Sequence, residues 1–212
     1  MRRNGGPPFP RKVPAWRLLV LPLLVILAGC EDSTAPQTSQ VQIQLTDAPA
    51  EAIASAQVWI SRVFLKGCET EGEGEEECLD VDLFNDPETP RTYDLLTLQD
   101  GITADLTDPV EVEVGIYHQL RMKVDSAVVT LAEGYSFADG TLEAVLKVTG
   151  GGTIKVRLDQ PIDAEADELT VVLVDFDVDR NFVFQGGGTG NVFNGVLFTP
   201  TLNELGRTKS GN

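Results

Sequence analysis

The chain has 212 residues, a formal net charge of −17 at pH 7 and 42% hydrophobic residues. This hydrophobic fraction is too high for a disordered chain, and the length is sufficient for one well-buried core. A strongly acidic chain repels phosphate backbones and anionic head groups, so the charge argues against nucleic acid as a partner.

Residues 1–29 have the layout of a secretory signal. Five basic residues and no acidic residue precede Cys30, and residues 18–27 form an apolar run interrupted only by Pro22. Ten helical residues span about 15 Å, which is half of a hydrocarbon core of about 30 Å. We therefore interpret residues 1–29 as a removable signal peptide. Its removal changes the formal net charge from −17 to −22.

The end of this segment, Leu27-Ala28-Gly29-Cys30, resembles the lipobox of bacterial lipoproteins. The resemblance implies that Cys30 is acylated and becomes the first residue of the mature chain, which makes the membrane a partner through this lipid anchor. Glu31 follows the cysteine, which favours the outer membrane, with the domain on its periplasmic or surface face. The alternative is an ordinary secretory signal followed by an incidental cysteine.

The rest of the chain predicts a flexible tether over 30–39, one domain over 40–202 and a C-terminal tail over 203–212. Short apolar runs, many of them alternating, predict strands, and a short turn or one or two helical turns are expected over 50–55. The fold class is therefore all-β, an antiparallel β-sandwich of immunoglobulin-like or transthyretin-like type with at most one or two short helical turns. The expected strands are 41–46, 58–65, 79–84, 91–96, 110–114, 116–124, 127–131, 142–148, 153–158, 169–176 and 192–198.

Cys68 and Cys78 enclose a loop with six glutamates. An isolated cysteine pair in an exported protein is most simply a disulfide. The bridge would also hold together like charges that repel one another. A zinc site is the alternative, but two thiolates and the single distant His118 fall short of four ligands.

Four short motifs, in this order along the chain, resemble those of a prokaryotic domain family of unknown function. Members of this family are commonly exported or lipid-anchored. The resemblance implies a β-sandwich and brings no activity, substrate or catalytic residue. This chain departs from the pattern by its cysteine-bounded glutamate loop and by Arg180-Asn181-Phe182 after the acidic strand. The motifs are Leu45-Thr46-Asp47-Ala48-Pro49, Tyr93-Asp94-Leu95-Leu96, Gly115-Ile116-Tyr117-His118-Gln119-Leu120-Arg121 and Asp175-Phe176-Asp177.

Asp175, Asp177 and Asp179 occur at every second position. An extended backbone would place the three carboxylates on one face, where oxygen ligands suit calcium. The alternatives are a solvated acidic strand face and a carboxylate pair of a glycosidase, which would also need a cleft. We expect no cofactor, with calcium at these aspartates as the alternative.

The strand over 116–124 carries the remaining candidates. His118, the only histidine, is in step with Leu120 and Met122, which predicts a core or rim position. Tyr117, Gln119 and Arg121 are expected on the opposite face, where aromatic, amide and guanidinium groups suit a sugar or peptide ligand. The alternative is that a second layer covers them.

These patterns contain no catalytic set, since no nucleophile can be paired with His118 and no Gly-x-Ser-x-Gly motif occurs. We therefore expect a non-enzymatic, lipid-anchored binding or structural module of the cell envelope, with an unidentified glycan or protein ligand. A calcium-binding or carbohydrate-binding envelope domain is the alternative. A hydrolase of envelope polymers is a third hypothesis.

The anchor is tested by metabolic labelling with palmitate. Wild type should incorporate label, and Cys30→Ser should lose it because the acylated sulfur is absent. Cys68→Ser, which removes a cysteine outside the lipobox, serves as the control and should retain the label. Equal labelling of wild type and Cys30→Ser would contradict the anchor.

Overall fold

The computed structural model describes residues 37–47, 50–71, 75–148, 150–186 and 191–211, with 68–71, 75–79, 147 and 150 described by backbone alone. Cys30, the signal segment, most of the tether, and the centre of the glutamate loop lie outside these ranges. The described residues belong to one compact unit. Within them, no helix has the length and apolar character needed to cross a membrane.

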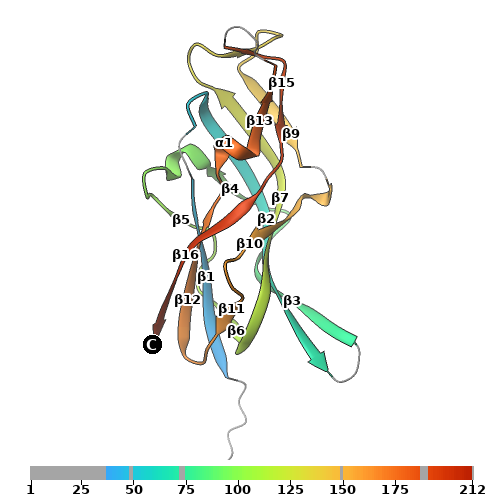
Figure 1. The fold of residues 1–212 in the computed structure, drawn as a ribbon, viewed down its shortest axis with the longest axis vertical. Helices are drawn as coiled ribbons and strands as arrows, with labels where there is room; N and C mark the ends of the chain where they lie inside the picture. Colours follow the sequence, from blue (N-terminus) through green and yellow to red (C-terminus); the bar gives the residue numbers. More distant parts are fainter. Residues whose placement is uncertain (1–36, 48–49, 72–74, 149, 187–190, 212) are drawn as a thin grey trace, which may run out of the picture. The chain divides into compact units, whose positions relative to one another are not determined.

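Most of this unit is β-structure, and one twelve-stranded sheet contains most of the strands (Figure 1). Its main path runs β3-β2-β7-β10-β16-β12-β1-β5, with β4, β6, β9 and β11 paired alongside. The strands of this sheet are β1 (Thr38–Thr46), β2 (Ile53–Glu71), β3 (Glu75–Asn85), β4 (Arg91–Asp94), β5 (Ala104–Asp105), β6 (Val110–Glu113), β7 (Gly115–Leu131), β9 (Glu143–Lys147), β10 (Thr153–Arg157), β11 (Ile162–Ala164), β12 (Glu168–Asp175) and β16 (Leu202–Gly211).

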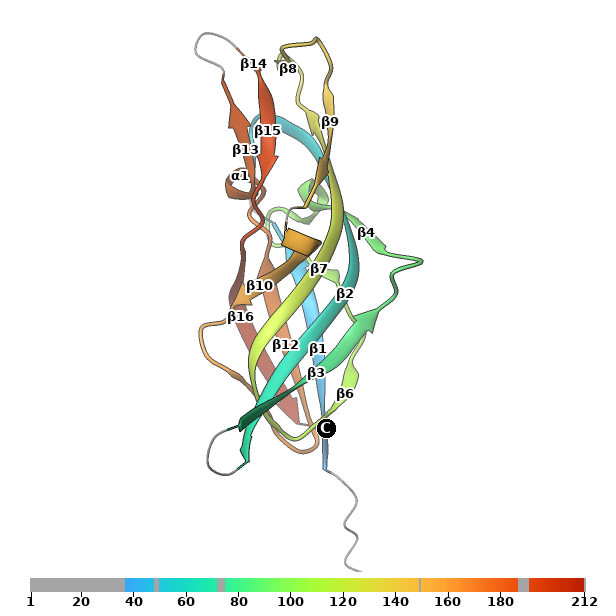
Figure 2. The same cartoon turned by 90° about the vertical axis from the view of Figure 1, so that its right-hand side faces the viewer.

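Two small sheets and three short helical segments complete the fold. One small sheet pairs β13 (Phe182–Gln185) with β15 (Gly195–Phe198), and the other pairs β8 (Ser136–Phe137) with β14 (Val192–Phe193). The helical segments are η1 (Leu95–Leu98), η2 (Gly150–Gly152) and α1 (Val178–Asn181). Figure 2 shows β8, β9, β13, β14 and β15 gathered at the end of the unit opposite the start of β1.

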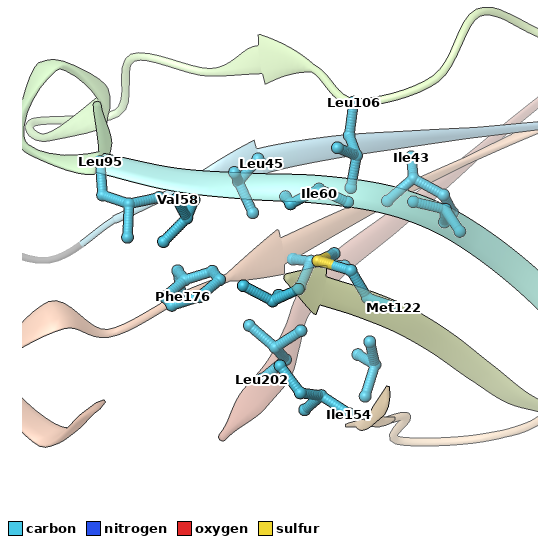
Figure 3. Close-up of a cluster of buried hydrophobic side chains, with 14 of the residues drawn as sticks. Ile43, Leu45, Val58, Ile60, Leu95, Leu106, Met122, Ile154, Phe176 and Leu202 are labelled. Atoms are coloured by element: carbon cyan, nitrogen blue, oxygen red, sulfur yellow. The ribbon is translucent and has the colours of Figure 1, made fainter. Parts of the chain in front are cut away.

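The large sheet curls, so that strands from both ends of its order share one hydrophobic core. Ile43 and Leu45 of β1 belong to the same buried cluster as Ile60 of β2 and Met122 of β7. Figure 3 shows these side chains meeting between the strands. Apolar residues alternate with polar ones along β1, which explains its single buried face. The predicted predominantly β fold is confirmed, whereas the immunoglobulin-like or transthyretin-like type stays a prediction.

The strand directions are mixed where the sequence predicted an antiparallel arrangement. Most pairs are antiparallel, but β1 pairs with β12, β10 with β16 and β8 with β14 in parallel. Alternation along one strand reports a buried face and contains no information about the direction of its neighbour. The sequence patterns therefore could not predict the parallel pairs.

The predicted C-terminal tail is wrong, because residues 202–211 form β16. This strand lies between β10 and β12 and pairs with β12 along its whole length. Only Leu202 and Glu204 of β16 are buried, so the strand lacks the apolar alternation by which the others were found. Backbone hydrogen bonds to two neighbours hold it in the sheet.

The structure bears on two further predictions, near β2 and β7. Residues 116–124 and 127–131 were predicted as two strands and form the single strand β7, which has a register shift at Asp125. Of the short turn or helical turns expected over 50–55, the structure has the short turn, since residues 51–52 form a turn and β2 begins at Ile53. Asp125 is the extra residue of a bulge in β7. The bulge shifts the apolar alternation by one residue, and in the sequence such a shift resembles the end of one strand and the start of another.

β2 and β3 form a long hairpin in which Cys68 and Cys78 are register partners. Directly opposite residues of an antiparallel pair lie about 4.5 to 5.5 Å apart between Cα atoms. A disulfide spans about 4.4 to 6.8 Å between Cα atoms. The backbone therefore places the two cysteines within bridging range, which supports the predicted disulfide.

We predict a Cys68–Cys78 bridge in the exported protein. Closing a loop of this size should stabilise the fold by about 2.5 to 3 kcal/mol, and reduction should lower the free energy of unfolding by that amount. Mass spectrometry after alkylation without reductant measures the thiols. Alkylation of both Cys68 and Cys78 in the native exported protein would contradict the bridge.

Candidate functional site

Three of the four sequence motifs meet at one corner, where β1 and β12 end and η1 begins. Thr46 of β1 is the register partner of Asp175 of β12. The backbone N–H of Phe176 donates to the Thr46 carbonyl at 3.1 Å, and the N–H of Asp47 donates to the Leu98 carbonyl at 3.1 Å. The corner therefore joins segments that are far apart in the chain.

The carboxylates of this corner bind backbone N–H groups. Asp47 is 6% exposed and accepts a hydrogen bond of 2.9 Å from the N–H of Val178, the first residue of α1. Asp94 accepts from the N–H groups of Ala56 and Leu96 at 3.1 and 3.2 Å. Both side chains satisfy backbone donors at the ends of elements. Maintenance of the fold is sufficient to explain these two motif residues.

The three aspartates proposed for calcium do not share a strand face. β12 ends at Asp175, and Asp177 adopts a left-handed backbone (φ 46°) as the N-cap of α1. Its carboxylate accepts from the N–H of Arg180, and the exposed Asp179 lies within the helical turn. The predicted alignment is wrong because the chain turns after Phe176. A period of two places residues on one face only while the backbone is extended.

Calcium gains no support elsewhere in the described ranges, where no group of three His, Cys, Asp or Glu side chains is placed to hold a metal ion. Asp175 already accepts a hydrogen bond of 3.1 Å from the N–H of Asp177. Burial raises the pKa of the Asp175 carboxyl above its usual range, and the nearby Asp177 carboxylate adds to this rise. We therefore do not propose a calcium site at these aspartates.

A bulge reverses the predicted faces at the start of β7. Lys66 pairs with Gln119 and Gly67 pairs with Tyr117, so His118 has no register partner in β2. One extra residue shifts the alternation, which turns Tyr117 inward and His118 outward. The predicted core or rim position of His118 is therefore wrong, and its side chain is exposed.

The predicted ligand set of Tyr117, Gln119 and Arg121 is consequently divided between the two faces of the sheet. Tyr117 is 5% exposed, packs in the core cluster and donates from its hydroxyl to the Glu113 carbonyl at 2.9 Å. Gln119 and Arg121 stay on the outer face, where the guanidinium Nε donates to the amide oxygen of Gln119 at 2.9 Å. Only the last two remain available to a ligand on that face.

The outer face of β2, β7 and β10 gathers the basic side chains of an otherwise acidic domain. Of the eleven basic residues after Cys30, six point outward from these adjacent strands. Register places Arg121 between Phe64 and Lys155, and Lys123 between Arg62 and Thr153. We call this surface the basic face. Its six residues are Arg62 and Lys66 of β2, Arg121 and Lys123 of β7, and Lys155 and Arg157 of β10.

Carboxylates neutralise the β3 side of the basic face, and Asp125 lies 3.8 Å from Lys123 on β7. Asp80 pairs with Arg62 and Lys66 at 3.4 and 2.8 Å, and Asp82 also pairs with Arg62. The hydrogen bond from Lys66 holds the pKa of the Asp80 carboxyl below its usual range.

The β10 side of the basic face carries uncompensated charge. Arg121, Lys155 and Arg157 have no carboxylate within ion-pair distance among the described side chains. Repulsion between three neighbouring cations is reduced when an anion binds among them.

Two features give the basic face its shape. Phe64, on the outer side of β2, is 4% exposed, and the Arg62 guanidinium lies 4.0 Å from its ring centroid. A hollow of about 470 Å³ borders β10, with Lys155 and Arg157 in its wall beside the 198–201 segment. Its hydroxyl groups come from Thr153, Thr199 and Thr201.

The sequence reading missed the basic face because its residues come from three separate segments. In each segment the signal is weak, with two cations at alternate positions or four apart, as in Lys155 and Arg157. The overall charge of −17 also argues against anionic ligands, because a net charge contains no information about where the basic residues gather. The available signal was the presence of outward-facing cations on each of three predicted strands. Only the strand order shows that these three strands are neighbours.

Comparison with known proteins identifies a family and no function. Residues 38–193 match the model of a family described as a domain of unknown function (DUF4382). No curated protein and no solved structure matches the chain.

Because the pKa of Asp175 is raised, replacing this residue with asparagine should increase the free energy of unfolding by an amount that depends on pH. The folded state disfavours the ionised carboxylate, so the stability contribution of Asp175 is complete below its unfolded-state pKa of about 3.9 and is lost as the pH rises through the folded-state pKa. Asp175→Asn keeps an oxygen acceptor for Asp177 and cannot ionise. Its stabilisation relative to wild type should be larger at about pH 7 than at about pH 3.5.

Urea unfolding at both pH values measures this difference, with the exposed Asp179→Asn as the matched charge control. Equal effects of Asp175→Asn at the two pH values would contradict the role of burial.

Proposed function

Because the chain belongs to the DUF4382 family, whose function is unknown, we propose its function from the surface of the domain. The proposal is a lipid-anchored, non-enzymatic module of the bacterial cell envelope that binds an anionic ligand on its basic face. The observation that carries it is the segregation of six of eleven basic residues onto three adjacent strands.

Electrostatics favours this use of the surface. The domain after Cys30 has a formal charge of −22, so its overall field repels anions at long range. Screening in physiological salt limits this repulsion to about 8 Å, and the local cations dominate at contact distance. An anion placed between Arg121 and Lys155, which face each other across adjacent strands, approaches two cations that no carboxylate of the described part neutralises.

The proposed lipid anchor would also determine where in the cell envelope this binding surface lies. The eight residues from Cys30 to Gln37 span at most about 27 Å, so acylation of Cys30 would keep the domain close to the membrane that holds the lipid. Glu31 favours the outer membrane as that location. The ligand would then be an anionic component of the envelope.

The proposal includes a β-sandwich architecture and no catalysis. The sandwich is supported by the curled sheet, whose strands β1 and β2 contribute to one common core. The only imidazole, His118, is exposed beside the basic face, and the sequence pairs it with no nucleophile. Binding therefore explains the surface without a reaction.

The binding proposal is tested with the unit 35–212 and dextran sulfate at low salt. Lys155→Gln/Arg157→Gln should weaken binding about tenfold, because two attractive charges are removed, and added salt should weaken wild-type binding. Arg180→Gln/Lys209→Gln makes the same change in net charge away from the basic face and should bind like wild type. Equal affinity of the two double variants would contradict binding at the basic face.

A further inference from the structure

We infer that the anionic ligand is an acidic polysaccharide that lies along the outer face of β2 and β7, with one sugar ring against Trp59. This inference rests on the proposed function and names the class of its ligand. Three features carry it: the extent of the surface, the position of Trp59, and the polar groups beside that side chain.

The surface is elongated. Trp59 and Lys66 both point outward from β2, seven residues apart, which corresponds to about 23 Å along a strand. Across the strands the cations extend from β2 to β10, which are separated by β7 and therefore lie about 10 Å apart. A strip of these dimensions is longer than a single small anion and matches several units of a linear polymer.

Trp59 lies at one end of this strip. Its neighbours Val58 and Ile60 are fully buried, so Trp59 points to the outer face, where it is partly exposed. It is the only tryptophan after Cys30. A partly exposed indole offers a flat apolar platform to a sugar ring and a polar N–H for its hydroxyl groups.

Hydroxyl side chains flank this platform on both sides. Register places Thr92 of β4 and Ser126 of β7 opposite Trp59 on the two neighbouring strands. Gln119 and Thr153 lie among the cations farther along the strip. Alcohol and amide groups around an aromatic ring suit the hydroxyl groups of a carbohydrate, while the cations suit its carboxylates or sulfates.

This arrangement favours a polysaccharide over an acidic polypeptide. Phe64, the apolar residue at the centre of the basic face, is covered and 4% exposed, so it offers no open pocket for an anchoring side chain. The exposed groups are spread along a sheet surface with one aromatic platform at its end. The cations alone would bind any polyanion, whereas the indole of Trp59 would favour a polymer that contains sugar rings.

The experiment titrates the unit 35–212, whose single tryptophan is Trp59, with four polymers. Polygalacturonate is the acidic polysaccharide, dextran is the neutral polysaccharide, and polyglutamate and polyphosphate are polyanions without sugar rings. We expect polygalacturonate to bind most tightly and to change Trp59 fluorescence at saturation. By calorimetry, Trp59→Leu should weaken polygalacturonate binding about tenfold, and Trp59→Phe should retain most of the affinity.

The outcomes separate this inference from the proposed function. Equal affinity for polygalacturonate and polyglutamate, with unchanged Trp59 fluorescence, would overturn the polysaccharide class and leave anion binding at the basic face intact. Absence of binding by all three polyanions would overturn both. Because the fluorescence measurement uses wild type, the inference stays testable if Trp59→Leu fails to fold.

Discussion

The antiparallel ladder between β2 and β7 decides which of their side chains face the core and which face outward. It extends from Ile53 to Gly67 on β2 and contains four register shifts. Each shift leaves one residue without a partner and reverses the alternation of the strand that carries it. The bulge at His118 exchanges the faces of Tyr117 and His118, and the shift at Asp125 lets one strand bury apolar residues in both of its halves.

The same ladder explains how an acidic domain acquires a basic surface. The inner face of β7 must be apolar because it packs against β1 across the core, and this requirement leaves only the outer positions for charged residues. Cations occupy those positions on β2, β7 and β10, and Asp80 and Asp82 neutralise the side that borders β3. The remaining cations lie on the same outer face as Trp59, and the proposed ligand would contact both.

The motif residues that resemble those of a domain family have a different role from the proposed binding surface. Asp47 and Asp94 bind the backbone at the starts of α1 and η1, and Asp175 ends β12 beside them. Buried carboxylates that satisfy backbone donors determine where elements start and stop. These motif residues therefore maintain the fold, while the basic face lies on the outer surface of β2, β7 and β10.

The sequence by itself determined the strand-rich fold, because the alternation of Val41, Ile43 and Leu45 requires one buried face. It also determined the candidates for the anchor and the disulfide, since Cys30 and the Cys68–Cys78 pair are recognisable from local spacing. Only the tertiary structure decided the parallel pairs, the position of β16 and the basic face. Each of these depends on which strands are neighbours, and hydrogen bonds between distant segments establish that order without leaving a local pattern in the chain.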